Sequence, residues 1–551
     1  MTNGPTATGA AGRNTPPVDA MDGPRLALAG QIVTMDAART VLKTGVVYFD
    51  KGLIVAVLDK AAPPPADFAG VPVVETGGTI YPGLIDLHNH LSYNILQLWD
   101  VPKQFGNRGQ WAGIPEYRNN ISGPMQVIGQ TPDLLASVVR YVEVKCLIGG
   151  VTTSQGIELF SNHGVRRFYR GLVRNVEQTN DPSLPEAGSR IADVDSQDAQ
   201  SFLSRLGQKQ CYLLHLAEGV DDAARKHFLS LQINGDEWAI TKSLAGIHST
   251  ALHPEDYEIM AKRGASMIWS PFSNLLLYGS TARVADARAA GVAIGLGADW
   301  SPSGSKNLFG ELKVARLVTR GEAAFDDKAL LAMATIDAAK ILHWEHLIGS
   351  IEAGKRADLM VLDGTPADPY GAFFTTPETS VTFVSINGIP RFGTSDLFQH
   401  VGLDGETFKL DGQVRRLNLA PSSTTGADPA VDAVSFAHAR DSLTQSLEDL
   451  PNLANAAPRA IPFGVGAPTQ WFLALDELAP TGVDVRPNLP IDGQRPAPAM
   501  LGVMPLAAPV LHPLTLDALT VADDARFLDL VRAAKNLPEV IKQDLPGLYG
   551  G

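Results

Sequence analysis

His88 and His90 stand two residues apart at the end of the apolar run TIYPGLIDLH (79–88). In an extended segment, residues i and i+2 project to the same side, so both imidazoles can reach one metal ion. A His-x-His pair alone is weak evidence in a chain with 12 histidines,. Its position at the end of a predicted strand strengthens it. The pair therefore indicates a metal site, with two hydrogen-bonded polar residues in a loop as the alternative.

Three more groups of this kind close apolar runs. His215 ends one run and Glu218 follows three residues later, so a metal ligand and a proton carrier could lie together,. His248 ends the run SLAGIH, where a lone histidine can equally be hydrogen-bonded structure. Asp299 ends VAIGLGAD, and an acid after a long apolar strand is costly to bury unless it is paired or binds a metal. Three neutral imidazoles and one carboxylate suit Zn²⁺ or Fe²⁺ with an open position for water.

A second pattern, Ser303-Gly-Ser-Lys306, matches the Ser-x-x-Lys of serine acyl enzymes,. Such a short pattern is expected by chance about once in a chain of this size. We therefore expect a loop beside the metal site, in which Ser303 contacts substrate. Gln155 and His163, which follow the second predicted strand, are further candidates for substrate binding. A serine hydrolase centred on Ser303 is the competing interpretation.

The elements that must position these groups alternate along the chain. From Thr79 to about Leu342, apolar strand-like runs alternate with amphipathic helical runs. Such alternation predicts parallel βα units, and the length suits an eight-stranded barrel, whose sites lie at the C-terminal ends of the strands. Seven strands are clearly marked, and the eighth is expected near RIADVD (190–195). The expected helices cover 133–150, 223–232, 254–264, 282–291 and 308–321.

Shorter β-like runs flank this barrel, which we place at residues 79–344. They occur in residues 25–78 and again in 345–415, so both flanks could build one small sheet domain,. Residues 1–24 are rich in Gly, Thr, Pro and Ala, which predicts a mobile tail. Residues 416–551 form a Pro- and Ala-rich extension that is partly helical. Its expected helices cover 436–450 and 522–536.

Composition limits the class of protein. With 45% hydrophobic and 19% charged residues the chain can form a large core,. A net charge of −14 argues against a nucleic acid or an anionic membrane as the main partner,. Cys146 and Cys211 lie in apolar stretches and indicate free thiols in a reducing cytoplasm. We expect neither a secretory signal nor a membrane span, because no suitable apolar run is present.

The ordered motifs resemble the amidohydrolase superfamily, in particular its branch of cytosine, guanine and S-adenosylhomocysteine deaminases and triazine hydrolases. The resemblance covers about residues 26–395. The matching pieces are YPGLIDLHNHL (81–91), GGVTT (149–153), HLAEG (215–219), IHSTALHPED (247–256), SPFSNLLLYGS (270–280), GVAIGLGAD (291–299) and IGSIEAGKRADLMVLD (348–363). The resemblance implies a distorted (β/α)8 TIM-like barrel with a small β-sandwich domain built from both flanks of the barrel.

The same resemblance implies a role for each candidate residue. It implies one divalent metal ion, zinc first and iron as the alternative, with the expected ligands His88, His90, His215 and Asp299. Glu218 would carry the proton, and His248 would orient the metal-bound water or polarise the substrate. Asp299 could also accept a proton from that water. Binuclear relatives use a carboxylated lysine on a strand, but Lys145 falls in a predicted helix, so we expect a single metal.

We therefore expect a metal-dependent hydrolase that cleaves a non-peptide C–N bond of a small molecule, by deamination or amide hydrolysis. Hydrolytic dehalogenation of a heterocycle needs the same activated water and is the alternative. A non-catalytic scaffold is less favoured, because the chain keeps every expected ligand. Trp300 and Gly219 depart from the residues usual in this branch, so the substrate stays open.

The extension lies outside the usual length of the family. Its apolar runs WFLALDEL (471–478) and MLGVMPLAAPVL (500–511) indicate a packed segment, because a disordered tail would not expose so much apolar surface,. We expect the extension to pack on the barrel exterior within a homodimer or higher homo-oligomer, rather than to cover the active site.

Overall fold

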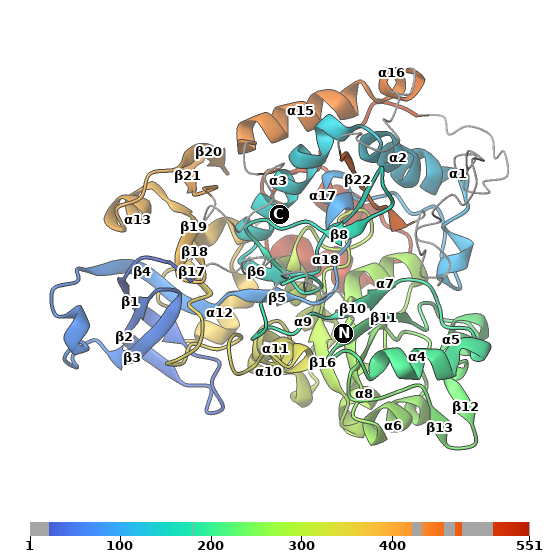
Figure 1. The fold of residues 1–551 in the computed structure, drawn as a ribbon, viewed down its shortest axis with the longest axis horizontal. Coiled ribbons are helices and arrows are strands. Elements are labelled where there is room, and N and C mark those ends of the chain that lie inside the picture. Colours follow the sequence, from blue (N-terminus) through green and yellow to red (C-terminus); the bar gives the residue numbers. More distant parts are fainter. Residues whose placement is uncertain are drawn as a thin grey trace, which may run out of the picture.

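The computed structural model describes residues 21–179, 181–420, 431, 434–456, 469–476 and 511–549. Within these residues the architecture is α/β, as expected, with a sheet on one side and parallel strands surrounded by helices on the other (Figure 1). Most of the predicted N-terminal tail and the run 500–510 lie outside the described residues.

Eight short parallel strands lie at the centre of the helical part and carry the predicted site residues at their ends. They form two sheets with the orders β5-β6-β9 and β10-β11-β14-β15-β16. Their bounds are β5 Leu84–Asp86, β6 Val151–Ser154, β9 Arg174–Asn175, β10 Gly188–Arg190, β11 Tyr212–Leu216, β14 Leu244–His248, β15 Ser266–Trp269 and β16 Ala293–Leu296.

Backbone hydrogen bonds also connect the two parallel sheets. On one side, Asp299 N donates to His88 O (2.8 Å) and His90 N donates to Asp299 O (2.6 Å). On the other side, Ala187 N donates to Val176 O (2.8 Å). The first pair of bonds holds the loop after β5 against the loop after β16, which brings two sets of predicted metal ligands together.

The weakly marked eighth strand lies at residues 188–190, slightly before the expected stretch 190–195. It ends at Arg190 because this side chain binds the carbonyls of Ala192 (2.7 Å) and Asp193 (2.6 Å). The carbonyl of Ile191 accepts from Arg108. These side-chain contacts hold the backbone after the strand in a loop.

The helices predicted from the amphipathic runs are present at the expected positions. They are α3 Pro132–Ile148, α5 Asp222–Leu229, α6 Pro254–Lys262, α8 Val284–Ala290 and α9 Leu308–Val318. Local capping explains some of their ends: the Asp221 side chain accepts from Ala224 N at the start of α5, and Gly291 ends α8 in the left-handed conformation,. Further helices of this part are α1 Pro115–Tyr117, α2 Gly123–Gly129, α4 Ala199–Leu206, α7 Pro271–Tyr278, α10 Asp327–Met333 and α11 Ile336–Leu342.

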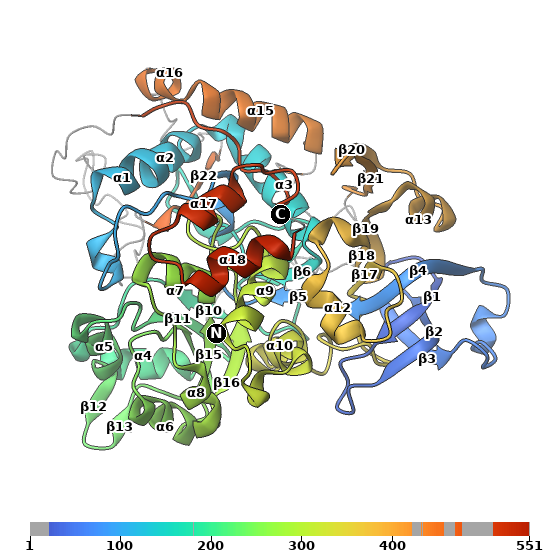
Figure 2. The same cartoon turned by 180° about the vertical axis from the view of Figure 1, so that it is seen from behind.

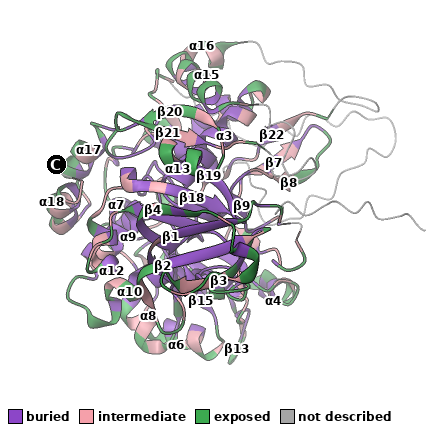
Figure 3. Cartoon of the chain, turned by 90° about the vertical axis from the view of Figure 1, so that its left-hand side faces the viewer, coloured by how far each residue is buried: buried purple, intermediate pink, exposed green. Residues whose placement is uncertain are grey.

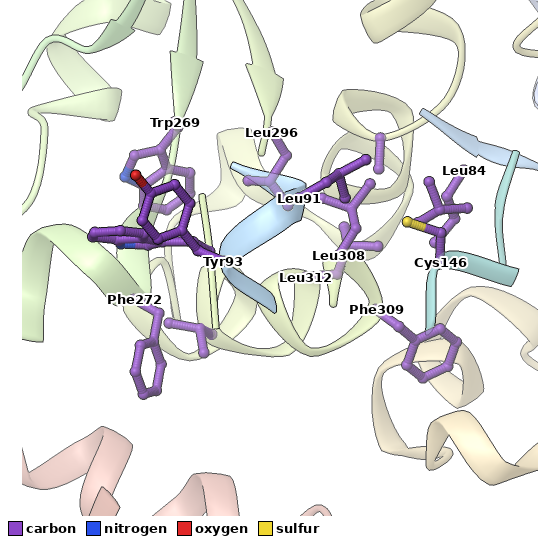
Figure 4. Packing of buried hydrophobic residues seen from close by; sticks show 14 of the residues in the cluster. Leu84, Leu91, Tyr93, Cys146, Trp269, Phe272, Leu296, Leu308, Phe309 and Leu312 are labelled. Carbon is purple, nitrogen blue, oxygen red and sulfur yellow. The ribbon is translucent and has the colours of Figure 1, made fainter. Parts of the chain in front are cut away.

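Apolar side chains fill the space behind the site. Leu296 of β16 and Trp269 of β15 lie near Leu91 and Tyr93, which follow the His-x-His pair, and α9 contributes Leu308 and Leu312 to the same cluster (Figure 4). These side chains are almost completely buried. Such dense packing limits the movement of the strand ends, and so helps to fix the distances between the polar groups above them.

The two flanks of the barrel form one sheet of nine strands, in the order β20-β21-β19-β18-β17-β4-β1-β2-β3. Antiparallel pairing of β4 with β17 joins the N-terminal flank to the C-terminal one, and β1 is almost wholly buried (Figures 1 and 3). Strand β4 runs directly into β5, so this sheet anchors the first barrel strand. The bounds are β1 Leu26–Val33, β2 Val41–Asp50, β3 Leu53–Asp59, β4 Val73–Pro82, β17 Leu359–Asp363, β18 Val381–Ile386, β19 Ile389–Thr394, β20 Glu406–Leu410 and β21 Gln413–Leu417. Helices α12 Pro369–Thr375 and α13 Ser395–His400 connect these strands.

The described parts of the C-terminal extension pack on helices that surround the parallel strands of the same chain. Helix α15 (Phe436–Glu448) lies along α3, and α18 (Glu539–Gly547) lies against α9 (Figures 1 and 2). Arg140 of α3 donates to the carbonyls of Val434 and Val431, and Tyr141 stacks on Phe436. The extension also contains α16 Leu450–Asn455, β22 Trp471–Leu473 and α17 Phe527–Ala533.

Strand β22 pairs antiparallel with β7 (Glu158–Ser161), which also pairs with β8 (Arg166–Phe168). Another hairpin, β12 Gln232–Asn234 with β13 Glu237–Trp238, lies at the far end of the barrel from this sheet. Across the described residues, no helix combines the length and apolar character needed to cross a membrane. Both cysteines are buried free thiols.

Candidate metal centre and active site

The four predicted metal ligands meet at the C-terminal ends of three strands. His88 Nε2 lies 3.1 Å from Asp299 Oδ1, and His90 Nε2 lies 3.5 Å from the same oxygen. His215 Nε2 lies 3.3 Å from His90 Nε2. His88, His215 and Asp299 are buried and His90 is nearly so. The strand ends therefore gather three imidazoles and one carboxylate at one point.

These donor atoms fit a divalent metal ion. His88 Nε2 is buried, and its 3.1 Å contact with Asp299 Oδ1 lacks the geometry of a hydrogen bond, so this nitrogen has no hydrogen-bond partner among the described residues. The Nε2 atoms of His90 and His215 face each other at 3.3 Å, and both present lone pairs to a metal when each ring carries its proton on Nδ1,. Ligand atoms about 2.0–2.1 Å from a tetrahedral ion lie roughly 3.3 Å apart. The observed separations of 3.1, 3.3 and 3.5 Å match this spacing.

Hydrogen bonds on the far side of the rings fix how two of the histidines point. His88 Nδ1 lies 3.0 Å from Gln155 Oε1, and the Gln155 amide donates to Glu177 Oε1 at 3.1 Å. His90 Nδ1 lies 2.7 Å from Asp476 Oδ2. A ring whose Nδ1–H is donated in this way presents Nε2 to the metal. Gln155, expected to contact substrate, thus lies where it can orient His88.

Burial and neighbouring charges set the protonation of these groups. Burial and the nearby rings of His88 and His90 hold the pKa of His215 well below its usual range, which keeps this imidazole neutral. Burial disfavours the ionised form of Asp299, but the adjacent histidines outweigh it and lower the pKa of this carboxyl. Burial also opposes protonation of His90, whereas Asp476 and Asp299 raise its pKa to about 9. A metal ion would have to displace a proton from His90.

Glu218 and His248 stand together beside the ligands. Glu218 Oε2 lies 3.7 Å from His248 Nε2, and Glu218 Oε1 accepts a 2.7 Å hydrogen bond from the Tyr278 hydroxyl. His248 Nδ1 lies 3.0 Å from Asn274 Oδ1. His248 and Asp299 both adopt left-handed backbone conformations, with φ of 64° and 65°. Such conformations are costly for residues other than glycine and concentrate at functional sites.

A cavity of about 290 Å³ opens onto these groups. Its apolar wall is made by the rings of Trp111, Tyr117 and Trp300, whose centroids lie 5.0 to 6.3 Å apart. Arg108 reaches the same cavity, with its guanidinium bound to Asp193 at 2.7 Å. A smaller cavity of about 90 Å³ is also lined by His90, His215 and Asp476. The larger cavity can hold a planar ring beside the proposed metal.

Two residues expected to touch substrate lie elsewhere. The Ser303 hydroxyl is buried between Ser273 Oγ and the Trp300 indole N–H, and it lines neither cavity. Lys306 binds Asp517 and is not paired with Ser303, so the geometry gives no support to a serine acyl enzyme. His163 is exposed in the turn between β7 and β8 and also lines neither cavity.

Sequence reasoning missed several residues of the site. Asn274 and Tyr278 lie inside the motif SPFSNLLLYGS (270–280), so that motif contained a signal for them. Trp111 and Arg108 lie in a loop with no marked pattern. Asp476 belongs to the extension, which we expected to avoid the active site. That expectation is wrong for residues 474–476, because after β22 these residues line the smaller cavity and Asp476 also lines the larger one.

A buried charge cluster fastens the last part of the extension behind the Asp299 loop. Lys145 Nζ binds Asp517, Ser301 Oγ (2.7 Å) and the carbonyl of Asn94 (3.1 Å). Lys306 Nζ lies 2.6 Å from Asp517 and 2.6 Å from Asp524. Lys145, the lysine considered for a second metal, is therefore held by this cluster.

Asp517→Ala should destabilise the fold strongly. The change leaves two buried ammonium groups short of a counter-charge, and removing one partner of a buried pair costs about 3–5 kcal/mol. The urea midpoint of unfolding should fall well below that of Asp529→Ala, a matched change at an exposed aspartate of the same extension. Equal midpoints for the two variants would show that the cluster does not fasten the extension.

Parts of the chain are similar to known proteins. Residues 214–390 match the amidohydrolase family. A 5-methylthioadenosine/S-adenosylhomocysteine deaminase of Teredinibacter turnerae is 27% identical over 325 residues, 53% of this chain and 73% of the relative. A protein of the same name from Shouchella clausii is 23% identical over 70% of this chain and 98% of its own length.

Solved structures share the fold. A triazine hydrolase from Arthobacter aurescens is 19% identical, with a TM-score of 0.54 over 67% of this chain and 94% of its own. A guanine deaminase from Bradyrhizobium japonicum is 14% identical, with a TM-score of 0.52 over 68% and 100%. An atrazine chlorohydrolase from Arthrobacter aurescens, complexed with zinc, is 18% identical, with a TM-score of 0.51 over 68% and 98%.

The match at residues 214–390 and the similarity to curated deaminases support the amidohydrolase superfamily for this chain. The chain is a hydrolase that acts on carbon–nitrogen bonds other than peptide bonds, and its His/Asp cluster supports a divalent metal.

Proposed function

We propose that this protein is a mononuclear zinc hydrolase that removes an amino group from a planar, nitrogen-containing ring. The observation that carries the proposal is that Glu218 lines one cavity with aromatic walls together with three of the four expected ligands, His90, His215 and Asp299. Trp111, Tyr117 and Trp300 offer flat surfaces to such a ring,. Relatives named as deaminases of methylthioadenosine and deoxyadenosine support ring deamination over amide cleavage.

His88, His90, His215 and Asp299 would hold the metal. A bound zinc ion would lower the pKa of its water toward about 7 and so supply hydroxide at neutral pH. Imidazole and carboxylate ligands are typical of catalytic zinc sites, which keep an open position for water. Iron is the alternative metal, since the same ligands suit it.

Glu218 would take the proton from the attacking water and pass it to the leaving nitrogen. Tyr278 holds Oε1 of Glu218, which leaves Oε2 on the side of His248. His248, whose Nδ1 is held by Asn274, would orient the water or polarise the substrate through Nε2. Asp299 could accept a proton from the same water.

The finer architecture is part of the proposal. The eight parallel strands would close into a distorted barrel over residues 79–344, with residues 25–78 and 345–415 as its β-sandwich. We propose a cytoplasmic homodimer or higher homo-oligomer, in line with the buried free thiols and with the net charge of −14. Its partner would be a small-molecule substrate.

The metal-loaded protein should convert aminated heterocycles in a screen read by mass spectrometry. The expected product has the mass that marks replacement of NH₂ by OH, and a chelator should abolish its formation. Fragment pairs from amides would redirect the assignment to amide hydrolysis, and chloride release from halogenated triazines would redirect it to dehalogenation. Turnover that survives complete metal removal would contradict the proposed mechanism.

A further inference from the structure

We propose that Asp476 is a positioning residue of the metal centre, delivered by the C-terminal extension to orient His90. This inference rests on the proposed function, because it concerns how tightly the site holds its metal. Asp476 lies well beyond residues 214–390, which match the amidohydrolase family. The extension would therefore contribute a part of the active site that the barrel itself does not supply.

The contact between the two side chains is short and directional. Asp476 Oδ2 lies 2.7 Å from His90 Nδ1. A carboxylate that accepts the Nδ1–H of an imidazole fixes the tautomer, fixes the ring and makes Nε2 a stronger donor to a metal. His90 Nε2 faces the other ligands, Asp299 and His215. Asp476 thus does for His90 what Gln155 does for His88, with a full negative charge in addition.

The extension carries Asp476 to this position through regular pairing. Strand β22 places Phe472 opposite Phe160 and Leu473 opposite Leu159 of β7. After the strand, Ala474 N donates to the carbonyl of Glu158 at 2.9 Å. The backbone then enters the site, where Asp476 N donates to the Tyr93 hydroxyl at 3.1 Å.

Side chains on both faces hold this short strand in place. Trp471 lies over the Arg167 guanidinium at 4.2 Å, and Phe472 stacks on Phe160 with ring centroids 5.3 Å apart. Leu473 and Leu475 are buried. The position of Asp476 therefore follows from packing along the whole segment 469–476, and the ion pair with His90 need not hold the segment by itself.

The surroundings of the pair show why the charge matters. The Asp476 side chain is 28% exposed and His90 is 14% exposed, so water screens the contact only in part. Asp299, Glu218 and the buried Asp86 are further carboxylates near the ligands. Arg108 is a nearby cation, 3.8 Å from Glu218. A further carboxylate beside a ligand favours a divalent cation in the centre.

The affinity of the metal-free protein for zinc tests this role without a measurement of activity. Wild type, Asp476→Asn, Asp476→Ala and the control Asp529→Asn are titrated with Zn²⁺ against a chromophoric chelator. Loss of such an outer partner typically costs about 10–100-fold in metal affinity, and we expect a loss in this range for Asp476→Ala. Asp476→Asn keeps a hydrogen-bond acceptor without the charge, so its loss should be smaller. Asp529 is exposed on α17, and its variant should bind like wild type.

The outcomes separate this inference from the proposed function. Zinc affinity within about threefold of wild type in both Asp476 variants would overturn it, because outer partners contribute more than that. Weakened binding with an unchanged thermal midpoint of the metal-free protein supports positioning. A midpoint that falls along with the affinity would assign Asp476 a structural role instead. Wild-type protein that binds no stoichiometric metal would refute the proposed function itself.

Discussion

His88→Ala and Asp299→Ala are expected to purify with much less metal and to show no measurable turnover. His88 Nε2 and Asp299 Oδ1 lie 3.1 Å apart at the centre of the donor set. Removing either one leaves three of the four expected donors, and the metal affinity should fall because each donor contributes to binding. Elemental analysis of the purified variants, together with turnover of the substrate found for wild type, measures both effects.

Exposed residues of the same types provide the controls for this experiment. His400→Ala, at the end of α13, and Asp529→Ala, in α17, lie outside the site and are exposed. Both should keep the metal content of wild type. Normal metal content in the His88 and Asp299 variants as well would show that the metal, if present, is held elsewhere.

Glu218→Gln is expected to keep its metal and lose most of its turnover. The amide preserves the shape and can still accept the hydrogen bond of Tyr278, but it cannot take up a proton at neutral pH,. General acid–base groups contribute about 10²–10⁴-fold, so kcat should fall by that factor. Metal analysis and single-turnover kinetics on the same sample separate loss of metal from loss of proton transfer.

The matched control is Glu75→Gln, because Glu75 lies on β4 with its side chain 62% exposed. It should retain the kcat of wild type. A fall in kcat of less than about tenfold in Glu218→Gln would be too small for the loss of a proton carrier. In that case His248 or Asp299 would have to perform the transfer.

Many of the helices around the parallel strands were predictable because their signals are local. The helices around 133–150, 254–264 and 308–321 follow from apolar periodicity, which depends on near neighbours,. The strand at 188–190 was harder to place, because only a few residues pair before Arg190 binds the next carbonyls. A short strand has too few residues to show a clear apolar periodicity, so contacts of this kind decide where it ends.

Short motifs were a less reliable guide to side-chain direction. Ser303 and Lys306 stand at the spacing of an acyl-enzyme motif, yet Ser303 faces Trp300 and Lys306 faces Asp517 and Asp524. The motif fixes a distance along the chain but not the neighbours that compete for each side chain. Here buried carboxylates bind the lysine, because an isolated buried ammonium would be costly.

The sequence by itself determined which groups could bind a metal: His88, His90, His215 and Asp299 end apolar runs, and parallel strands bring such ends to one edge,. Only the tertiary structure decided what surrounds them. Asp476 has no local pattern that points to His90, and its 2.7 Å contact depends on β22 pairing with β7, far earlier in the chain. The apolar periodicity of a segment shows which of its faces is buried. Pairing between distant strands depends on the packing of the whole chain, so no short stretch of sequence predicts it.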